Sequence, residues 1–317
     1  MSILPKASTI LLLSAAFSAG AAQAAVVDLG IGGANFYTLG SFNSSNSSVG
    51  GALLVAGSMN ASNYSINSQN KDAYGSSAYA LVVGGSLNYQ SGSINNGSYY
   101  VGGSSNISNT GFGGGAAQSG SAPLSFTETS AQLKNTALSL SKVAATGTAT
   151  AAPGGLTLTG SGNGGVQVFD ISGASLLSAN NLSFNKLKAN DTVIVNVSGS
   201  VSGFNNVGLN GLNKYNVLFN FYEASSLSLQ GFGLDGSVLA PLASVNGGNG
   251  SINGNVVVGN WNSNIAIGGG NAFKASDVAG LVSPVPEPET YAMLLAGLGL
   301  LGFVARRKAA KGKLLAA

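Results

Sequence analysis

The sequence predicts a mainly β fold, a right-handed β-solenoid with one flanking α-helix, followed by a hydrophobic helix at the C-terminus. Three observations support this prediction: short β-branched segments recur, one segment between them has helical periodicity, and the 317 residues include no Cys. Without Cys, disulfides cannot contribute to stability, so the chain depends on a repetitive hydrogen-bonded architecture.

The first 24 residues predict a cleaved signal peptide. Lys6 supplies a short cationic start, and an apolar stretch follows at residues 10–17. Small residues on both sides of Gln23 give a small-x-small cleavage pattern, so we expect cleavage after Ala24 or Ala25. An uncleaved membrane helix is the alternative, but the apolar part is short for a membrane span.

The segments that predict the solenoid are short strands, each ended by Gly and followed by turn residues rich in Ser and Asn. Copies of this repeat lie at residues 53–60, 81–88, 99–106, 236–240 and 254–258. Gly57, Gly85 and Gly103 are equivalent, at separations of 28 and then 18 residues. A repeat of roughly 18–20 residues suits one coil of a solenoid, and Asn at matching positions can form ladders. A β-sandwich is the rival, because short strands with turn signals fit it as well.

One segment between the repeats predicts the flanking helix. Ser125 and Glu128 form a capping box, in which each side chain satisfies a free backbone N–H group of the other. Apolar residues then follow at helical spacing: Leu133, Ala137, Leu140 and Ala144. Because Gly147 closes the run, we expect an amphipathic helix over residues 127–145 that covers one flank of the solenoid.

Further strands are expected after this helix. Residues 156–158, 166–171 and 192–197 alternate or run apolar, as strands do. Residues 215–222 are the most hydrophobic stretch of the body and predict a central strand. Residues 246–254, rich in Gly and Asn, predict a loop.

The C-terminus has three parts in a fixed order: a proline-rich linker, an apolar run and a block of cations. The linker motif is Val285, Pro286, Glu287 and Pro288, which cannot be helical because each Pro bars the preceding residue from the α region. The predicted membrane anchor and stop-transfer residues are Tyr291, Leu294, Leu295, Leu298, Leu301, Phe303, Arg306, Arg307 and Lys308. A buried core helix is the alternative, since the run is shorter than the roughly 20 residues of a full span.

The positive charge of the chain belongs to its two ends. The full sequence has 13 Lys and Arg residues against 10 Asp and Glu residues, but seven cations and eight acids remain once the two end segments are removed. The body is therefore near a net charge of −1 and has no Arg, so we expect no nucleic-acid partner. The apolar content of the full chain, 44%, argues against disorder.

The residue types of the body exclude most catalytic chemistry. Because His and Cys are absent, no Ser-His or Cys-His pair and no thiolate or imidazole metal site can form. A carboxylate pair is conceivable, and Asp235 with Glu223 is the first candidate. The body acids are Asp28, Asp72, Glu128, Asp170, Asp191, Glu223, Asp235 and Asp277. Their spacing is not that of a calcium repeat, so we predict no enzyme, no cofactor and no metal site.

Two kinds of surface could carry recognition instead. An ice-binding face needs a flat array of Thr, and the short runs at residues 146–150 and 157–159 are too few to make one. Aromatic residues in polar surroundings could stack on sugars, although each taken alone is typical of a partly buried strand residue. These are Trp261, Tyr64, Tyr74, Tyr79, Tyr89, Tyr99 and Tyr100.

Two parts of the chain resemble known families. The linker motif, apolar run and cations resemble the PEP-CTERM sorting signal, which implies processing by exosortase near residues 286–288. The body resembles the choice-of-anchor A domain of bacterial surface proteins over residues 28–277. Segments that carry this second resemblance are residues 36–42, 48–57, 216–225, 236–241 and 252–256. It implies an adhesin with a layout similar to that of ice-binding β-helix proteins, and it brings no enzymatic motif.

These observations predict a division of the chain into five segments. They are a signal peptide at residues 1–24, a choice-of-anchor A-like domain at 25–277, a Pro-rich linker at 278–289, a sorting or transmembrane segment at 290–308 and a cytoplasmic tail at 309–317. We expect an exported protein of the cell envelope, cell surface or extracellular matrix, anchored in the membrane at least transiently. Its predicted role is structural or adhesive, with exopolysaccharide or another surface as partner. An ice-binding protein is the first alternative, and a polysaccharide-processing enzyme is the second.

Overall fold

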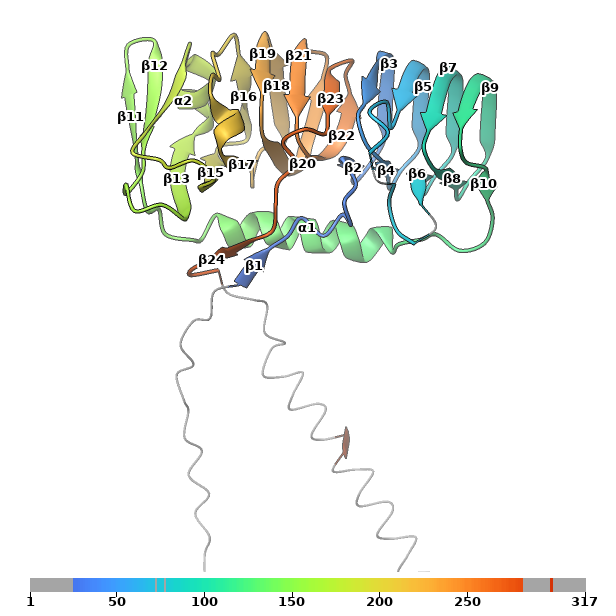
Figure 1. Ribbon diagram of the computed structural model, residues 1–317, viewed down its shortest axis with the longest axis horizontal. Coiled ribbons are helices and arrows are strands. Elements are labelled where there is room, and N and C mark those ends of the chain that lie inside the picture. The colour runs from blue at the N-terminus through green and yellow to red at the C-terminus, as the bar shows by residue number, and fades with distance from the viewer. Residues whose placement is uncertain (1–24, 72, 77, 282–296, 299–317) are drawn as a thin grey trace, which may run out of the picture.

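Short parallel strands form one curled sheet along the length of the body (Figure 1). The computed structural model describes residues 25–71, 73–76, 78–281 and 297–298. Within these ranges the curled sheet contains 19 strands, and neighbouring layers pair in parallel. The mainly β prediction is confirmed, and parallel pairing is not that of an antiparallel β-sandwich.

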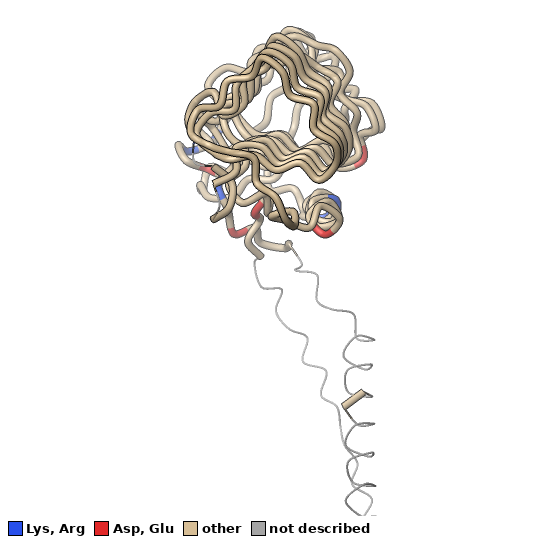
Figure 2. The backbone as a smooth tube through the Cα atoms, turned by 90° about the vertical axis from the view of Figure 1, so that its right-hand side faces the viewer, with Lys and Arg blue, Asp and Glu red and all other residues tan. Residues whose placement is uncertain are grey.

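The strands superpose in layers when the molecule is seen end on (Figure 2). One side of the layers lies against helix α1 (Phe126–Leu140), and we call it the covered side. Its strands are β13 (Val166–Ser172), β15 (Thr192–Ser198), β17 (Asn216–Asn220), β2 (Phe36–Thr38), β4 (Leu53–Val55), β6 (Tyr79–Val83), β8 (Ser98–Val101) and β10 (Ala117–Gln118), with the first parts of β20 (Ser237–Asn246) and β22 (Val256–Asn262).

The remaining strands of the curled sheet form the sides that α1 does not cover. They are β16 (Val201–Asn205), β18 (Ser226–Gln230), β19 (Phe232–Leu234), β21 (Gly250–Asn253), β23 (Ala266–Gly268), β3 (Phe42–Val49), β5 (Met59–Ile66), β7 (Leu87–Asn95) and β9 (Ser105–Gly113). Two smaller sheets lie outside it. One pairs β1 (Ala25–Val27) with β24 (Ser276–Val278), and the other joins β11 (Thr148–Ala152), β12 (Gly155–Thr159) and β14 (Leu182–Asn185).

The repeats stack as their spacing predicts. Leu53 of β4 is level with Leu81 of β6, and Leu81 is level with Tyr99 of β8. The equivalent glycines are joined as well, because Gly85 donates to the carbonyl of Gly57 and Gly103 to that of Gly85, each at 2.9 Å. Irregular spacing in the sequence therefore reflects turns of different length between strands that remain in register.

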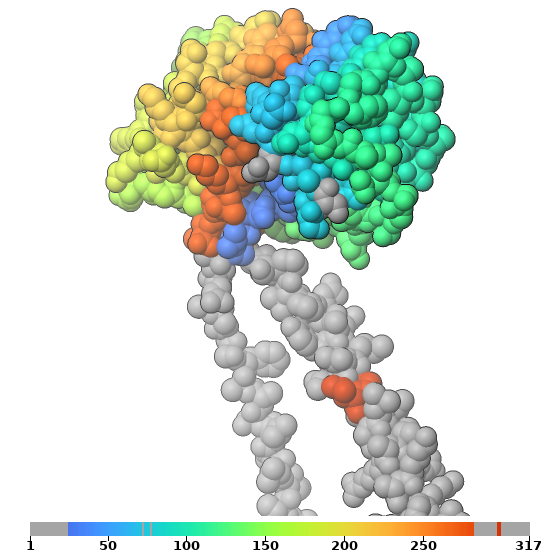
Figure 3. Space-filling view, turned by 45° about the vertical axis from the view of Figure 1, so that its right-hand side comes forward, coloured from blue at the N-terminus to red at the C-terminus, as the bar shows by residue number. Residues whose placement is uncertain are grey.

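The two ends of the body meet in the middle of the stack, which the repeats do not reveal. Strand β2 lies between β4 and β22, so Phe36 is level with both Leu53 and Val256. Figure 3 shows the late layers, in orange, directly beside the early layers, in blue. Consequently the early layers extend from β2 in the middle of the stack to β10 at one end. Helix α1 then runs along the sheet to the opposite end, and the later layers lead from there back to the middle (Figure 1).

Helix α1 covers the apolar outer surface of the covered side. Leu133, Ala137 and Leu140 are fully buried there, as the predicted stripe requires. Asn220 donates from Nδ2 to the carbonyl of Ala137 at 2.9 Å, and Asn196 donates to that of Leu140 at 3.0 Å. The sheet thereby adds a second donor to two carbonyls of the last helical turns, which also accept from the backbone N–H groups of Ser141 and Val143.

The predicted end of this helix is wrong by five residues. The side chain of Ser125 does accept from the N–H of Glu128, at 3.4 Å, but the helix ends at Leu140 instead of Ala145. Beyond it, the N–H groups of Thr146 and Gly147 donate to the carbonyl of Val168, so the chain has already turned onto the sheet. Ala144 is accordingly exposed.

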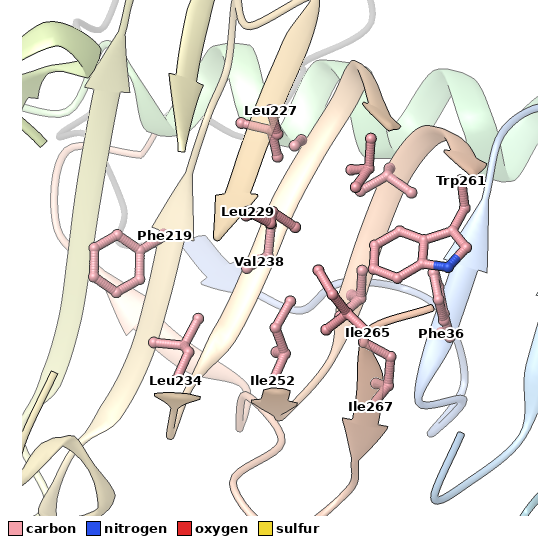
Figure 4. Packing of buried hydrophobic residues seen from close by; sticks show 14 of the residues in the cluster. Phe36, Phe219, Leu227, Leu229, Leu234, Val238, Ile252, Trp261, Ile265 and Ile267 are labelled. Carbon is pink, nitrogen blue, oxygen red and sulfur yellow. The ribbon is translucent and has the colours of Figure 1, made fainter. Parts of the chain in front are cut away.

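Edge-to-face aromatic contacts fill the interior where the two ends of the body meet. Phe36 lies with its ring centroid 4.8 Å from that of Trp261 and 5.5 Å from that of Phe42, and Phe42 continues to Tyr64 at 5.4 Å. Figure 4 shows Trp261 above Phe36, with aliphatic side chains of the neighbouring layers around them. Large apolar burial of this kind is the main stabilising contribution that replaces disulfides here.

The remaining predicted elements are found with two corrections. Segments 156–158, 166–171 and 192–197 lie in β12, β13 and β15, and the segment 215–222 contains the buried strand β17. The predicted loop 246–254 is wrong, because β21 pairs there between β19 and β23 and buries Ile252.

The second correction is an additional α-helix, α2 (Gly173–Ser178), which the sequence patterns do not predict. Ser172 begins it by accepting from the N–H of Ser175 at 3.1 Å, but the helix is too short for its periodicity to stand out. A short 3-10 helix, η1 (Leu212–Lys214), precedes β17.

Both end segments fall largely beyond the described residues. The predicted signal peptide, the motif from Val285 to Pro288, and the anchor apart from Leu298 lie outside them. Gly297 and Leu298 are helical, and Leu298 is exposed. Across the ranges that are described, no helix has the length and apolar character needed to cross a membrane.

Candidate functional site

A ladder of six asparagines runs across the outer surface of consecutive layers. Its members are Asn246, Asn262, Asn43, Asn60, Asn88 and Asn106, which strand register places level with one another. Asn88 donates from Nδ2 to Oδ1 of Asn60 at 2.9 Å, and Asn106 donates in the same way to Asn88 at 3.0 Å. All six are exposed, although exposed Asn is ordinarily a poor strand residue.

Hydroxyl and amide groups form further rows beside this ladder. On one flank Ser104 donates to the hydroxyl of Ser86 at 3.0 Å, and the N–H of Ser86 donates to that of Ser58 at 3.1 Å. On the other flank the N–H of Ser45 donates to Oδ1 of Asn264 at 2.8 Å, and register continues the row through Ser62, Gln90 and Ser108. We call these three rows together, from β20 through β22, β3, β5 and β7 to β9, the polar face.

A column of left-handed residues bounds the polar face. Asn46, Asn63, Ser91 and Asn109 follow one another at this corner, with φ between 48° and 55°. Asn tolerates this conformation better than other residues with a side chain, which explains its repeated use there. The corner turns each strand at the same point, so the rows of the polar face stay aligned.

The polar face carries no charge. The strands that form it, β3, β5, β7, β9, β20 and β22, contain no Asp, Glu, Lys or Arg. In the end-on view, the charged residues lie below the layers, at their lower corners and on the helix (Figure 2). A surface of this composition can bind only through neutral hydrogen bonds and van der Waals contact.

Shallow hollows lie along the ladder. One of about 500 Å³ is lined by the ladder residues Asn43, Asn60 and Asn262 together with neighbouring Ser and Gly. A second, of about 330 Å³, continues past Asn88 to Asn106. In a ladder each Asn uses one N–H and part of its oxygen, which leaves one donor and one acceptor lone pair for a ligand. These groups repeat at the strand spacing of about 4.8 Å.

Three of the six ladder residues lie outside the repeat copies that the sequence predicts. Asn60, Asn88 and Asn106 stand in the predicted copies, whereas Asn43, Asn246 and Asn262 do not. Asn43 could have been found, because Gly-Ser-x-Asn at residues 40–43 matches residues 57–60, 85–88 and 103–106. Asn246 and Asn262 follow more divergent segments, and only the meeting of the two chain ends places them in the row.

The carboxylate pair considered for catalysis is not brought together. Glu223 follows the end of β17 at Asn220, whereas Asp235 precedes the start of β20 at Ser237. Since these strands are parallel neighbours with Leu218 level with Ser237, the two carboxylates lie beyond opposite strand ends. Asp72 lies outside the described residues. Among the residues that are described, no three His, Cys, Asp or Glu side chains gather as metal ligands would.

Asp235 and Glu223 instead have structural partners. Asp235 accepts from the side-chain amides of Asn253 and Asn271, both at 2.9 Å. Glu223 accepts from the N–H of Gly199. These contacts fix turns between layers, so both acids have a structural role.

Most of the aromatic candidates for sugar stacking are inside the molecule. Trp261, Tyr64 and Tyr89 are fully buried and Tyr79 nearly so, while Tyr74, Tyr99 and Tyr100 are partly buried. Burial raises the pKa of both Tyr64 and Tyr89 above the ordinary value. The expectation of strand residues is correct for six of these side chains, whereas Tyr74 makes only an isolated bridge with Tyr79. The buried ones cannot contact a ligand.

The threonine runs form a small patch at one end of the stack. Strands β11 and β12 place Thr150 level with Thr157 and Thr148 level with Thr159. Thr157 also shares a hydrogen bond of 2.9 Å with Ser183 on β14. The patch is larger than the separate runs suggest, but it spans only three strands.

Comparison with known families gives two matches. A family model described as "Putative Ice-binding-like adhesive domain" matches residues 30–270, and one described as "PEP-CTERM protein-sorting motif" matches residues 284–308. The first match spans every layer of the curled sheet, and the second contains the predicted linker motif and cations. The chain matches no curated protein and no solved structure.

Proposed function

Since the chain belongs to the ice-binding-like adhesive domain family, we propose that its polar face adheres to a neutral, hydroxyl-rich polymer of the cell envelope or the exopolysaccharide matrix. The family is adhesive and not enzymatic. The PEP-CTERM motif implies export and sorting to the cell surface, where such polymers are found.

The observation that carries this proposal is the uncharged, six-layer array of amides and hydroxyls. A single neutral hydrogen bond contributes only about 0.5–1.5 kcal/mol net, so one Asn would hold a polymer weakly. Repetition at constant spacing lets many such bonds form at once, and avidity then greatly exceeds the affinity of one contact. The absence of charge favours a neutral partner, since neutral hydroxyls need no counter-charge.

The architecture that supports this function is a right-handed β-solenoid over residues 25–277. Stacked layers, parallel register and side-chain ladders are what such a fold requires. A rigid scaffold matters for adhesion because it holds the rows level without an entropic cost on binding.

Exosortase is the partner that the sorting motif implies, since this motif is the signal that the enzyme recognises. In the proposed sequence of events the signal peptide at 1–24 directs export. Residues 290–308 then hold the chain in the membrane through an apolar run and the stop-transfer cations Arg306, Arg307 and Lys308, with 309–317 in the cytoplasm. Cleavage at the linker, residues 278–289, would release the body to the surface or matrix.

A pull-down of the full chain on exopolysaccharide from the producing cells tests the adhesive function. The variant carrying Asn60→Lys and Asn88→Lys places two charges in the ladder and should lose most retention. The variant carrying Gln132→Lys and Asn135→Lys, both at exposed positions on α1, is the matched control and should be retained like the wild type. Equal retention of the ladder variant, or no retention of the wild type, would count against the proposal.

Ice is the second candidate ligand, favoured by the ice-binding-like family match and by the periodicity of the same uncharged face. A rigid array with a constant repeat can match a crystal surface that has its own constant repeat. An assay of ice recrystallisation with the same three proteins decides this point. Inhibition by the wild type and the matched control variant, but not by the ladder variant, would support ice. Lack of inhibition at high protein concentration would exclude it.

A further inference from the structure

Lysines gather at one lower corner of the layers, away from the polar face (Figure 2). Four of the seven body lysines belong to this region: Lys186 and Lys188 on the turn before β15, Lys214 before β17, and Lys274 on the segment leading to β24. The turns are bonded to one another, since Asn190 donates from its backbone to the carbonyl of Lys214 at 2.8 Å. The body therefore has a cationic corner although its net charge is close to zero.

A pocket of about 300 Å³ opens between two of these lysines. Lys214 lines it from the layers and Lys274 from the descending segment, and amide and hydroxyl side chains complete its wall. In Figure 3 the descending segment, in orange, runs beside the yellow layers. Both lysines are exposed, so their ammonium groups can reach a ligand at the pocket mouth.

The wall of the pocket is fixed by one asparagine. Asn216 donates from Nδ2 to the carbonyl of Lys274 at 2.9 Å and to the hydroxyl of Ser276 at 3.1 Å, and it accepts from the N–H of Lys274 at 2.9 Å. These bonds tie the descending segment to β17. The separation of the Lys214 and Lys274 backbones is consequently set by the fold and not by a free loop.

Two acids near this corner, Asp191 and Asp235, already accept hydrogen bonds from the fold. Asp191 is buried and accepts from the N–H groups of Gly165 and Lys188, each at 2.8 Å. Asp235 accepts from the amide of Asn271, which lines the pocket on its other side. Backbone and amide donors therefore hold the two carboxylates at the edge of the pocket.

A hollow of about 310 Å³ adjoins the pocket and shares Lys214 and Tyr215 with it. Phe184 lies on its floor, with its ring centroid 5.9 Å from that of Tyr215 and the two rings tilted by 45°. Both rings are only partly buried. They form a shelf on which the apolar face of a sugar ring can stack, while Asn side chains can bond its hydroxyls.

Ammonium groups, an aromatic shelf and amides together match one ligand chemistry. We infer that this pocket binds the acidic residues of a uronate-containing polysaccharide. The carboxylate of the uronate lies between Lys214 and Lys274 in charge-assisted hydrogen bonds, and the ring next along the polymer rests on Tyr215 and Phe184. This site goes beyond the proposed function, because it is separate from the polar face. It binds a negatively charged sugar, whereas the polar face binds a neutral polymer.

Calorimetric titration of the full chain with polygalacturonate oligosaccharides tests the inference, with dextran as the neutral probe. Lys214→Gln and Lys274→Gln should each raise the Kd for polygalacturonate roughly tenfold, the equivalent of one charge-assisted bond. Wild-type binding should weaken as salt rises, because the ammonium groups are exposed to solvent.

Lys134→Gln and Lys142→Gln are the matched controls, since they remove the same charge from positions on and just after α1, away from the pocket. They should bind polygalacturonate like the wild type. An equal loss in these controls would show attraction by net charge alone and overturn the site, as would unchanged binding in Lys214→Gln. The ladder variant separates the two proposals, because it should lose adhesion through the polar face and keep polygalacturonate binding.

Discussion

The covered side and the polar face are two outer surfaces of the same layers, and they differ in the side chains that point outward from a common backbone. On the covered side the outward residues Leu54, Val82 and Leu218 are fully buried under α1 and the chain ends. On the polar face the outward residues Asn60 and Asn88 are exposed. Strand pairing is parallel and in register on both. Composition of the outward columns, and not the backbone, therefore decides which surface is closed and which is available to a partner.

The covered side should fail first when its apolar packing is broken. We expect Leu133→Asp to lower the free energy of unfolding by about 4 kcal/mol, since it loses a buried Leu and buries an unpaired charge. Leu138→Asp makes the same change on the exposed face of the same helix and should change stability by less than about 0.5 kcal/mol. Denaturant unfolding of both variants measures the difference.

Equal effects of these two changes would show that α1 does not depend on the covered side. A large loss at Leu138 alone would place the other helix face against the sheet. Either result would break the distinction between the two surfaces.

Sequence patterns predict the local parts of this fold well. The copies at 53–60, 81–88 and 99–106 predict the register of β4, β6 and β8 correctly, because side-chain alternation and terminal glycines specify a strand directly. The stripe of Leu133, Ala137 and Leu140 likewise identifies the buried face of α1.

The parts that the sequence could not predict depend on contacts far apart along the chain. Asn43 and Asn262 become neighbours only because β22 docks on β3, and no local pattern encodes that junction. The cationic corner was missed for the same reason, since Lys214 and Lys274 are 60 residues apart and a net charge near zero concealed their meeting.

The interior between the two surfaces should limit stability at high pH. Burial raises the pKa of the Tyr64 hydroxyl above its unfolded value of about 10, so the folded state favours the protonated form. The stabilisation from the protonated Tyr64 hydroxyl is fully present below about pH 10. Above that pH its contribution to the free energy of unfolding falls by about 1.4 kcal/mol per pH unit. Unfolding in denaturant between about pH 8 and 12 measures the slope.

Tyr64→Phe is the matched variant for this slope. Among the described residues the Tyr64 hydroxyl has no hydrogen-bond partner, so its removal should leave stability at neutral pH within about 1 kcal/mol of the wild type. The variant should lose stability less steeply above about pH 10. An identical slope would mean that the alkaline limit has another source.

The sharpest comparison places the same residue type in a ladder on each surface. Asn220 is fully buried and bonds both the carbonyl of Ala137 and Oδ1 of Asn196, whereas Asn88 bonds Asn60 on the exposed polar face. Asn220→Ala should cost about 2 kcal/mol because it leaves buried Oδ1 of Asn196 without its donor and removes a bond to the helix. Asn88→Ala should cost about 0.5 kcal/mol because water replaces the lost bond. Adhesion should respond in the opposite order, since only Asn88 faces a ligand. If both changes destabilise the protein equally, the Asn ladder of the polar face is retained for folding and not for binding.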